Sequence, residues 1–128
     1  MAVFTEVSFD EAARLIDELG RQAVIVYIEP TTRLRAGLGA ATMHRLSTCG
    51  GVRYVWIGVD ARWTHQRLVA LIAHELQHAL EIARDQSVVS GDDIDRLFER
   101  IGFCRGHQCE TIAARDVEAR VVKELSRD

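Results

Sequence analysis

The sequence predicts a single α+β domain, and three observations support that prediction. Segments with a helical spacing of apolar residues alternate with short runs rich in β-branched residues. The chain has 128 residues, of which 48% are hydrophobic, and this length is sufficient for one buried core. No internal repeat or linker divides the sequence, so we expect residues 1–128 to form one domain.

The N-terminal half is predicted to hold one helix and three strands. Its elements are a helix from the Ser8–Glu11 capping box to Gly20, a strand at 23–29 ended by Pro30, a loop at 31–40, and a hairpin of 41–48 and 52–59 around Gly50-Gly51. The second hairpin strand, with the sequence VRYVWIGV, has the stronger strand pattern.

The C-terminal half is predicted to be helical around one loop. Its elements are a long helix at 64–84 with Thr64 as N-cap, a short helix at 92–101 ended by Gly102, a loop with cysteines and a histidine, and a last helix at 110–125. The order of helix, strand, hairpin and three further helices is typical of the α+β class.

Charge and hydropathy exclude several classes of function. With 16 Lys and Arg against 19 Asp and Glu, the net charge is 16 − 19 = −3, so the basic stripe of a nucleic-acid-binding protein is absent. No apolar run approaches the roughly 18 residues that span a bilayer. The first residues show no export signal, so we expect a cytoplasmic protein and leave export of a longer precursor open. The oligomeric state is also open.

Three cysteines, Cys49, Cys104 and Cys109, form an odd set. We expect them to be free thiols. Two alternatives stay open for the segment Cys104-Arg-Gly-His107-Gln-Cys109: a disulfide that closes a small loop, or a metal site that includes His107.

The central helix carries the motif His74-Glu75-Leu76-Gln77-His78. On a helix, His74 and His78 lie one turn apart and project the same way, so both imidazoles can bind one metal ion. Glu75 lies about 100° further round, where a carboxylate can act as a base without competing for the ion. The flanking apolar residues form the opposite face of the helix: Leu68, Ile72, Leu76, Ala79, Leu80 and Ala83.

The stretch LIAHELQHALEIA resembles the active-site helix of zincin metallopeptidases, and also short bacterial proteins with the sequence HELQHALE. The resemblance covers residues 68–84. It implies a small zincin-like domain with a mixed sheet of about three strands packed on the active-site helix, followed by C-terminal helices. It also implies Zn²⁺ held by His74 and His78, with Glu75 activating a zinc-bound water to hydrolyse a peptide or protein substrate.

A catalytic zinc site needs a third protein ligand, for which the sequence offers four candidates. Glu81 lies about 10 Å along the helix from His74, so we expect it to support a neighbouring group. Glu110 begins the apolar stripe of the last helix, and Glu110-Thr-Ile-Ala-Ala resembles the second zinc-binding helix of gluzincins. We therefore expect Glu110 to be the ligand, with His107, Glu118 and Glu81 as alternatives. Ala114 stands where many gluzincins have an Asp that orients a histidine.

The sequence leaves open which residue stabilises an oxyanion and which alternative function applies. Tyr54, His65, His107 and Arg115 are candidates to stabilise an oxyanion, and the spacing does not choose among them. By resemblance, strand 52–59 is expected to pair with the substrate backbone. The alternative functions are an inactive zinc-binding regulatory module, a deformylase-like hydrolase with Cys49 as ligand, and a metal-free helical domain.

Overall fold

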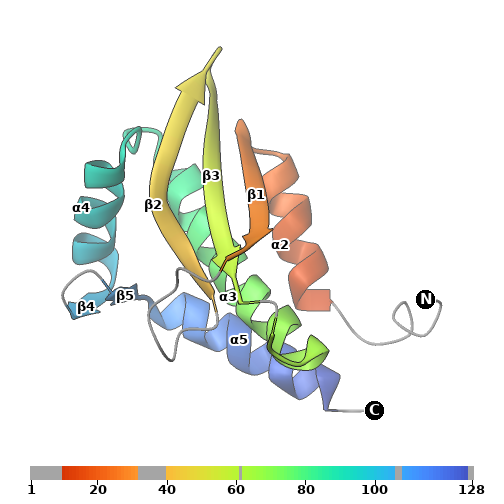
Figure 1. The fold of residues 1–128 in the computed structure, drawn as a ribbon. Helices are drawn as coiled ribbons and strands as arrows, with labels where there is room; N and C mark the ends of the chain where they lie inside the picture. Colours follow the sequence, from red (N-terminus) through yellow and green to blue (C-terminus); the bar gives the residue numbers. More distant parts are fainter. Residues whose placement is uncertain (1–9, 32–39, 61, 106–107, 127–128) are drawn as a thin grey trace.

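The computed structural model of the protein describes residues 10–31, 40–60, 62–105 and 108–126. Within these ranges the fold is α+β, as predicted, with four helices, a three-stranded sheet and a two-stranded sheet (Figure 1). Ser8, most of the loop at 31–40 and His107 lie outside the described residues. The elements are α2 (Asp10–Gly20), β1 (Val24–Pro30), β2 (Ala40–Cys49), β3 (Val52–Val59), α3 (His65–Arg84), α4 (Gly91–Ile101), β4 (Phe103–Arg105), β5 (Gln108–Glu110) and α5 (Ile112–Leu125). None of the described helices has the length and apolar character needed to cross a bilayer.

The larger sheet is mixed and has β3 at its centre. Its strand order is β1-β3-β2, with β1 parallel and β2 antiparallel to β3. The predicted hairpin of β2 and β3 is confirmed, and its turn uses Gly50 and Gly51 at φ angles of 60° and 81°, which favour glycine. Because β3 pairs on both sides, its backbone has no free edge for a substrate. The expectation that residues 52–59 bind a substrate backbone is therefore wrong, since the edges of this sheet are β1 and β2.

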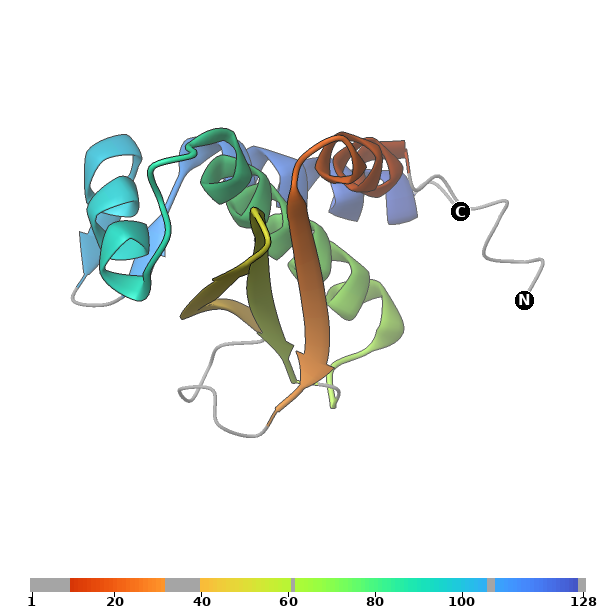
Figure 2. The ribbon, with the colours of Figure 1, turned by 90° about the horizontal axis from the view of Figure 1, so that it is seen from above.

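The helices lie on one face of the sheet and beside it, with α3 packed directly behind the strands (Figure 2). Alternation along β3 directs Val55 and Ile57 into the interior, where both side chains are fully buried. The main core joins α2, β3, α3 and α5 through Leu15, Leu19, Ile57, Leu76, Leu80, Val117 and Val121. The central helix is thus fixed on several sides.

A second apolar cluster positions α4 beside the end of α3. It contains Val55, Ile82, Val88, Ile94, Leu97 and Phe98. Ser90 caps the N-terminus of α4 by accepting a hydrogen bond from the Asp93 backbone. This cluster holds the C-terminal part of α3 between β3 and α4.

The buried side chain of Arg53, on β3, binds the C-terminal end of α3. Its side chain is only 8% exposed, and its guanidinium donates to four backbone carbonyl groups around the end of the helix. The acceptors are Ile82 (3.0 Å), Ala83 (2.7 Å), Asp85 (2.8 Å) and Val88 (3.0 Å). The role of Arg53 was not predictable from the sequence, because it depends on a contact between a strand and a distant helix end.

The segment between α4 and α5 differs from the prediction. Instead of a loop with free thiols, it forms the antiparallel pair β4 and β5, linked by a disulfide between Cys104 and Cys109. The Cα atoms of the two cysteines are 4.1 Å apart, which cross-strand pairing brings about and sequence spacing does not reveal. Cys49 is free and exposed, as expected.

Glu110 is the last residue of β5 and does not begin the last helix, which starts after the N-cap Thr111. Gly102 contacts the Glu110 backbone so closely that a Cβ at Gly102 would lie 2.1 Å from the Glu110 carbonyl oxygen. The hairpin thereby fixes the point at which the chain enters α5.

Candidate metal centre

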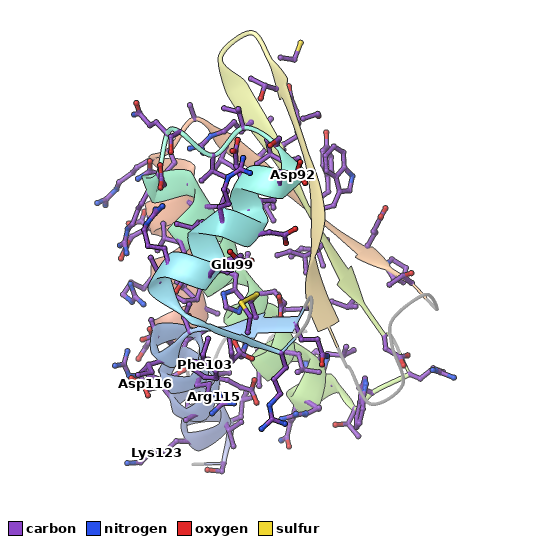
Figure 3. The ribbon with its side chains drawn as sticks, turned by 90° about the vertical axis from the view of Figure 1, so that its left-hand side faces the viewer. Asp92, Glu99, Phe103, Arg115, Asp116 and Lys123 are labelled. Carbon is purple, nitrogen blue, oxygen red and sulfur yellow. A yellow bond between two sulfur atoms is a disulfide. The ribbon has the colours of Figure 1, made fainter. Side chains whose placement is uncertain are left out.

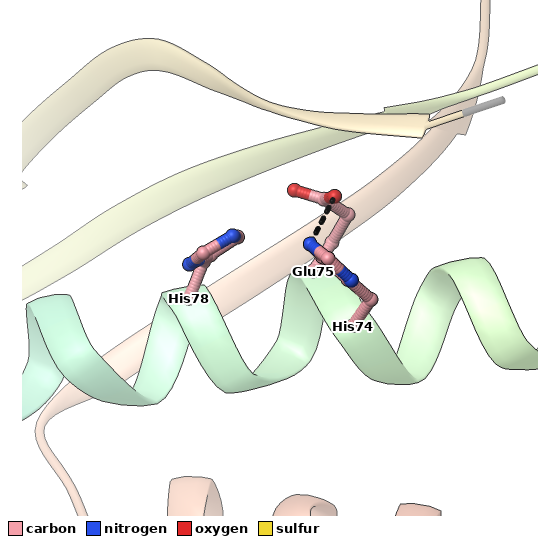
Figure 4. Close-up of side chains that lie close together, drawn as sticks. All are labelled: His74, Glu75 and His78. Atoms are coloured by element: carbon pink, nitrogen blue, oxygen red, sulfur yellow. Dashed lines mark ion pairs between the residues drawn. The ribbon is translucent and has the colours of Figure 1, made fainter. Parts of the chain in front are cut away.

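Helix α3 brings His74, Glu75 and His78 together at its buried centre (Figure 4). The predicted N-cap is confirmed, since Thr64 accepts a hydrogen bond from the backbone of Arg67. The two imidazole rings are 5.0 Å apart and both side chains are buried. His74, Glu75 and His78 each offer a ligand atom within 4.8 Å of the others, so the trio can hold a metal ion.

Glu110 reaches both histidines with one oxygen atom. Its Oε1 lies 2.7 Å from Nε2 of His74 and 3.0 Å from Nε2 of His78. Glu75 is more distant, since its Oε2 is 3.9 Å from Nε2 of His74. The two Nε2 atoms thus converge on Glu110, which comes from a different element of the fold.

The other ring nitrogens face two further carboxylates. Glu81 Oε1 lies 2.8 Å from Nδ1 of His78, and Glu118 Oε1 lies 2.8 Å from Nδ1 of His74. The Glu118 contact is close but is not aligned as a hydrogen bond, so Nδ1 of His74 has no hydrogen-bond partner among the described residues. A carboxylate beside the outer nitrogen of a histidine is the usual support of a metal ligand.

Both supporting carboxylates accept hydrogen bonds from further side chains. The hydroxyl group of Thr111 donates to Glu81 Oε2 at 2.8 Å. The Arg67 guanidinium donates to Glu118 Oε2 at 3.2 Å. The ring of Phe98 packs edge-on against His78 with centroids 5.0 Å apart. These contacts restrict the orientation of both imidazoles.

The contacts among His74, His78 and Glu110 shift the pKa values of these three groups. Burial lowers the pKa of His78, but hydrogen bonds to Glu110 and Glu81 outweigh it and raise that pKa to about 10. The pKa of His74 is also raised above 6.5, because burial is outweighed by its hydrogen bond to Glu110. Burial raises the pKa of Glu110, yet the two imidazoles lower it to about 2. In the metal-free protein, both rings are therefore mainly protonated at pH 6.

The donor set fits a divalent metal of the zinc type. Two imidazoles and one carboxylate are a ligand set of catalytic zinc sites, whereas magnesium and calcium prefer oxygen ligands alone. A tetrahedral zinc ion keeps its ligand atoms about 3.3–3.6 Å apart. The two distances to Glu110 Oε1 are 2.7 and 3.0 Å, so these side chains need to separate by less than about 1 Å.

The four candidates for the third ligand are now separated by position. Glu110 alone among the described candidates lies next to both Nε2 atoms. Glu81 supports His78, as expected, and Glu118 supports His74. Glu118 lies one helical turn beyond Ala114 on α5, and its carboxylate faces Nδ1 of His74. His107 lies outside the described residues.

The described candidates for oxyanion stabilisation lie at different distances from the cluster. Tyr54 lies on the sheet face opposite α3, where Tyr27 stacks on it, so it does not face the cluster. His65 is the first residue of α3, about 14 Å along the axis from His74. Arg115 lies in a pocket beside Glu110.

We expect Glu118→Ala to weaken zinc binding by about 10- to 100-fold without unfolding the protein, because His74 loses the carboxylate that orients its ring. Competition titration with a chromophoric chelator measures this change. Glu118→Gln, which keeps an acceptor oxygen, should show a smaller loss. Equal zinc affinity in the wild type and Glu118→Ala would contradict the supporting role.

Comparisons with protein-family models, curated proteins and solved structures gave no match to this chain. The interpretation of the cluster therefore depends on its geometry and chemistry.

Proposed function

We propose that the protein is a zinc-dependent peptidase in which His74, His78 and Glu110 hold the ion and Glu75 is the general base. The observation that carries the proposal is the convergence of two Nε2 atoms on one carboxylate oxygen, at 2.7 and 3.0 Å. The carboxylates facing both Nδ1 atoms support it further.

Each residue of the cluster has a separate role in the proposed hydrolysis. Zinc, when bound, supplies a Lewis acid that makes water more acidic and polarises a carbonyl oxygen. Glu75, within 3.9 Å of Nε2 of His74, accepts the proton of the attacking water and returns it to the leaving amine. Glu81, hydrogen-bonded to Nδ1 of His78, keeps that ring in the tautomer that presents Nε2 to the ion. The charge of Glu118, 2.8 Å from Nδ1 of His74, favours the same tautomer of His74. The net reaction consumes one water molecule for each amide bond cleaved.

An extended peptide substrate needs a free strand edge near the cluster. Because β3 is central, a backbone can add to this sheet, as far as the structure describes it, at the edge strands β1 and β2. Of these two, β2 contacts both α3 and α4. We therefore place the substrate backbone along β2.

Metal analysis of the purified protein tests the first part of the proposal. We expect one zinc ion per wild-type chain and a nearly complete loss of zinc in His78→Ala. His65→Ala is the matched control, because it removes a histidine from the same helix outside the cluster, and it should retain zinc. A wild type that binds no zinc at micromolar concentration would overturn the proposal.

Hydrolysis of a peptide library by the zinc-loaded protein, followed by mass spectrometry, tests the second part. We expect cleavage by the wild type and by His65→Ala, but none by His78→Ala. Stoichiometric zinc without cleavage of any peptide would instead assign the chain to a non-catalytic zinc-binding module.

A further inference from the structure

A polar pocket of about 490 Å³ adjoins the candidate metal centre. It is formed by the β4–β5 hairpin and the first turn of α5, and its lining residues are Phe103, Arg105, Gln108, Cys109, Glu110 and Arg115. Glu110 belongs both to this pocket and to the pair of Nε2 contacts. A molecule in the pocket therefore lies beside the residues that would hold the metal.

Two guanidinium groups line this pocket without a carboxylate partner among the described residues. Other arginines of the same fold are paired: Arg67 contacts Glu118, and Arg100 contacts Asp85. Arg105 and Arg115 have no such contact, so their charges stay available to a ligand. Glu110, the acidic residue of the pocket, is already engaged by both histidines.

Arg115 is oriented by an aromatic side chain. Its guanidinium carbon lies 4.9 Å from the centre of the Phe103 ring, so a cation–π contact positions it (Figure 3). Phe103 is 46% exposed, which leaves apolar surface beside the charge. The cation–π contact favours this orientation, and a guanidinium can bind a carboxylate with two parallel hydrogen bonds.

The wall of the pocket is cross-linked on the side of Arg105. The disulfide between Cys104 and Cys109 joins the two strands, and Arg105 pairs with Gln108 in the same hairpin. Gly102, directly before β4, lies against the Glu110 backbone at the end of β5. The arginine on the hairpin and the arginine on the helix therefore line the same pocket.

We propose that this pocket binds a carboxylate group of the substrate, so that the protein prefers peptides with an acidic residue, or the acidic chain end, close to the bond that is cleaved. This inference rests on the proposed peptidase function. Arg105 and Arg115 are its specificity-determining residues, and Phe103 contacts the aliphatic part of the acidic side chain.

Paired peptides that differ only by Glu against Gln test the preference. With the zinc-loaded wild type, we expect kcat/KM for the best Glu peptide to exceed that of its Gln partner by about tenfold or more, and the ratio to fall as salt rises. In Arg115→Gln the ratio should fall towards one, and Arg115→Lys should recover part of it. Arg120→Gln is the matched control on the same helix, because Arg120 pairs with Glu11 outside the pocket, and it should keep the ratio.

Amidated and free C-termini separate the two sources of the carboxylate. A preference that survives amidation assigns the pocket to a Glu side chain, and one that amidation abolishes assigns it to the chain end. Equal kcat/KM for Glu and Gln peptides at both termini would overturn the inference. So would a Glu preference that persists when both Arg105 and Arg115 are replaced by Gln.

Binding measurements distinguish this inference from the proposed function itself. The peptide pairs are titrated into zinc-loaded Glu75→Gln protein and followed by calorimetry. Tighter binding of acidic peptides that depends on Arg115 would support the pocket even if no peptide is ever cleaved. Cleavage without any Glu preference would retain the peptidase and remove the pocket.

Discussion

Glu75→Gln should bind zinc as the wild type does and lose roughly 10²- to 10⁴-fold in kcat. The physical reason is that Gln has the shape of Glu but cannot accept a proton from water. Glu75 Oε2 is 3.9 Å from Nε2 of His74, whereas Glu110 Oε1 lies within 3.0 Å of both Nε2 atoms, so Glu110 is the better ligand. Metal analysis and single-turnover kinetics on the same sample measure both quantities.

The matched variant for this experiment is Glu110→Gln, which should lose zinc affinity and activity together. The two variants thus separate the base from the ligand. If Glu75→Gln loses its zinc while Glu110→Gln keeps it, the roles of the two glutamates are exchanged. If Glu75→Gln retains full activity, the assignment of the general base is wrong.

Arg53→Met should lower the free energy of unfolding by about 3 kcal/mol or more, because four carbonyl groups around the end of α3, three of them in buried contacts, each lose a charged donor at once. For a domain of this size, that corresponds to a decrease in Tm of about 10 °C. Urea denaturation of the metal-free protein measures the effect without a contribution from zinc.

Arg62→Met serves as the control for Arg53. The Arg62 side chain is 81% exposed and pairs with Asp60, so its loss should leave the free energy of unfolding almost unchanged. Arg53→Lys keeps the charge but not the planar fork, and should fall between the wild type and Arg53→Met. Equal stability of Arg53→Met and the wild type would show that the buried guanidinium adds nothing.

Local signals were sufficient to predict most of the elements. The Thr64 cap and the apolar spacing located α3, and Gly50-Gly51 located the turn between β2 and β3, because caps and tight turns depend on neighbouring residues. The pair of histidines one turn apart was predictable for the same reason. Glu110 was predicted to join them, although it ends a strand and does not begin a helix.

Contacts between distant elements were not predictable from spacing. The roles of Glu118 and Arg53 depend on how α5 and β3 pack on α3. The central place of β3 depends on strand order, which no local pattern specifies. The pairing of Cys104 with Cys109 required the β4–β5 register, so the expected free thiols were wrong at these two positions.

The raised pKa values of the two imidazoles make metal uptake an ion exchange. Both rings hold a proton at mildly acidic pH, and zinc requires neutral nitrogen ligands, so each ion that enters displaces about two protons of equal total charge. Zinc affinity should therefore rise with pH, by up to about 100-fold per unit, until the ring with the lower pKa has titrated. Calorimetry in buffers of different ionisation enthalpy counts the released protons, and a count of zero would show that the rings are neutral before the metal arrives. Because zinc and protons compete for the same nitrogen atoms, acidification alone should release the zinc, without a chelator.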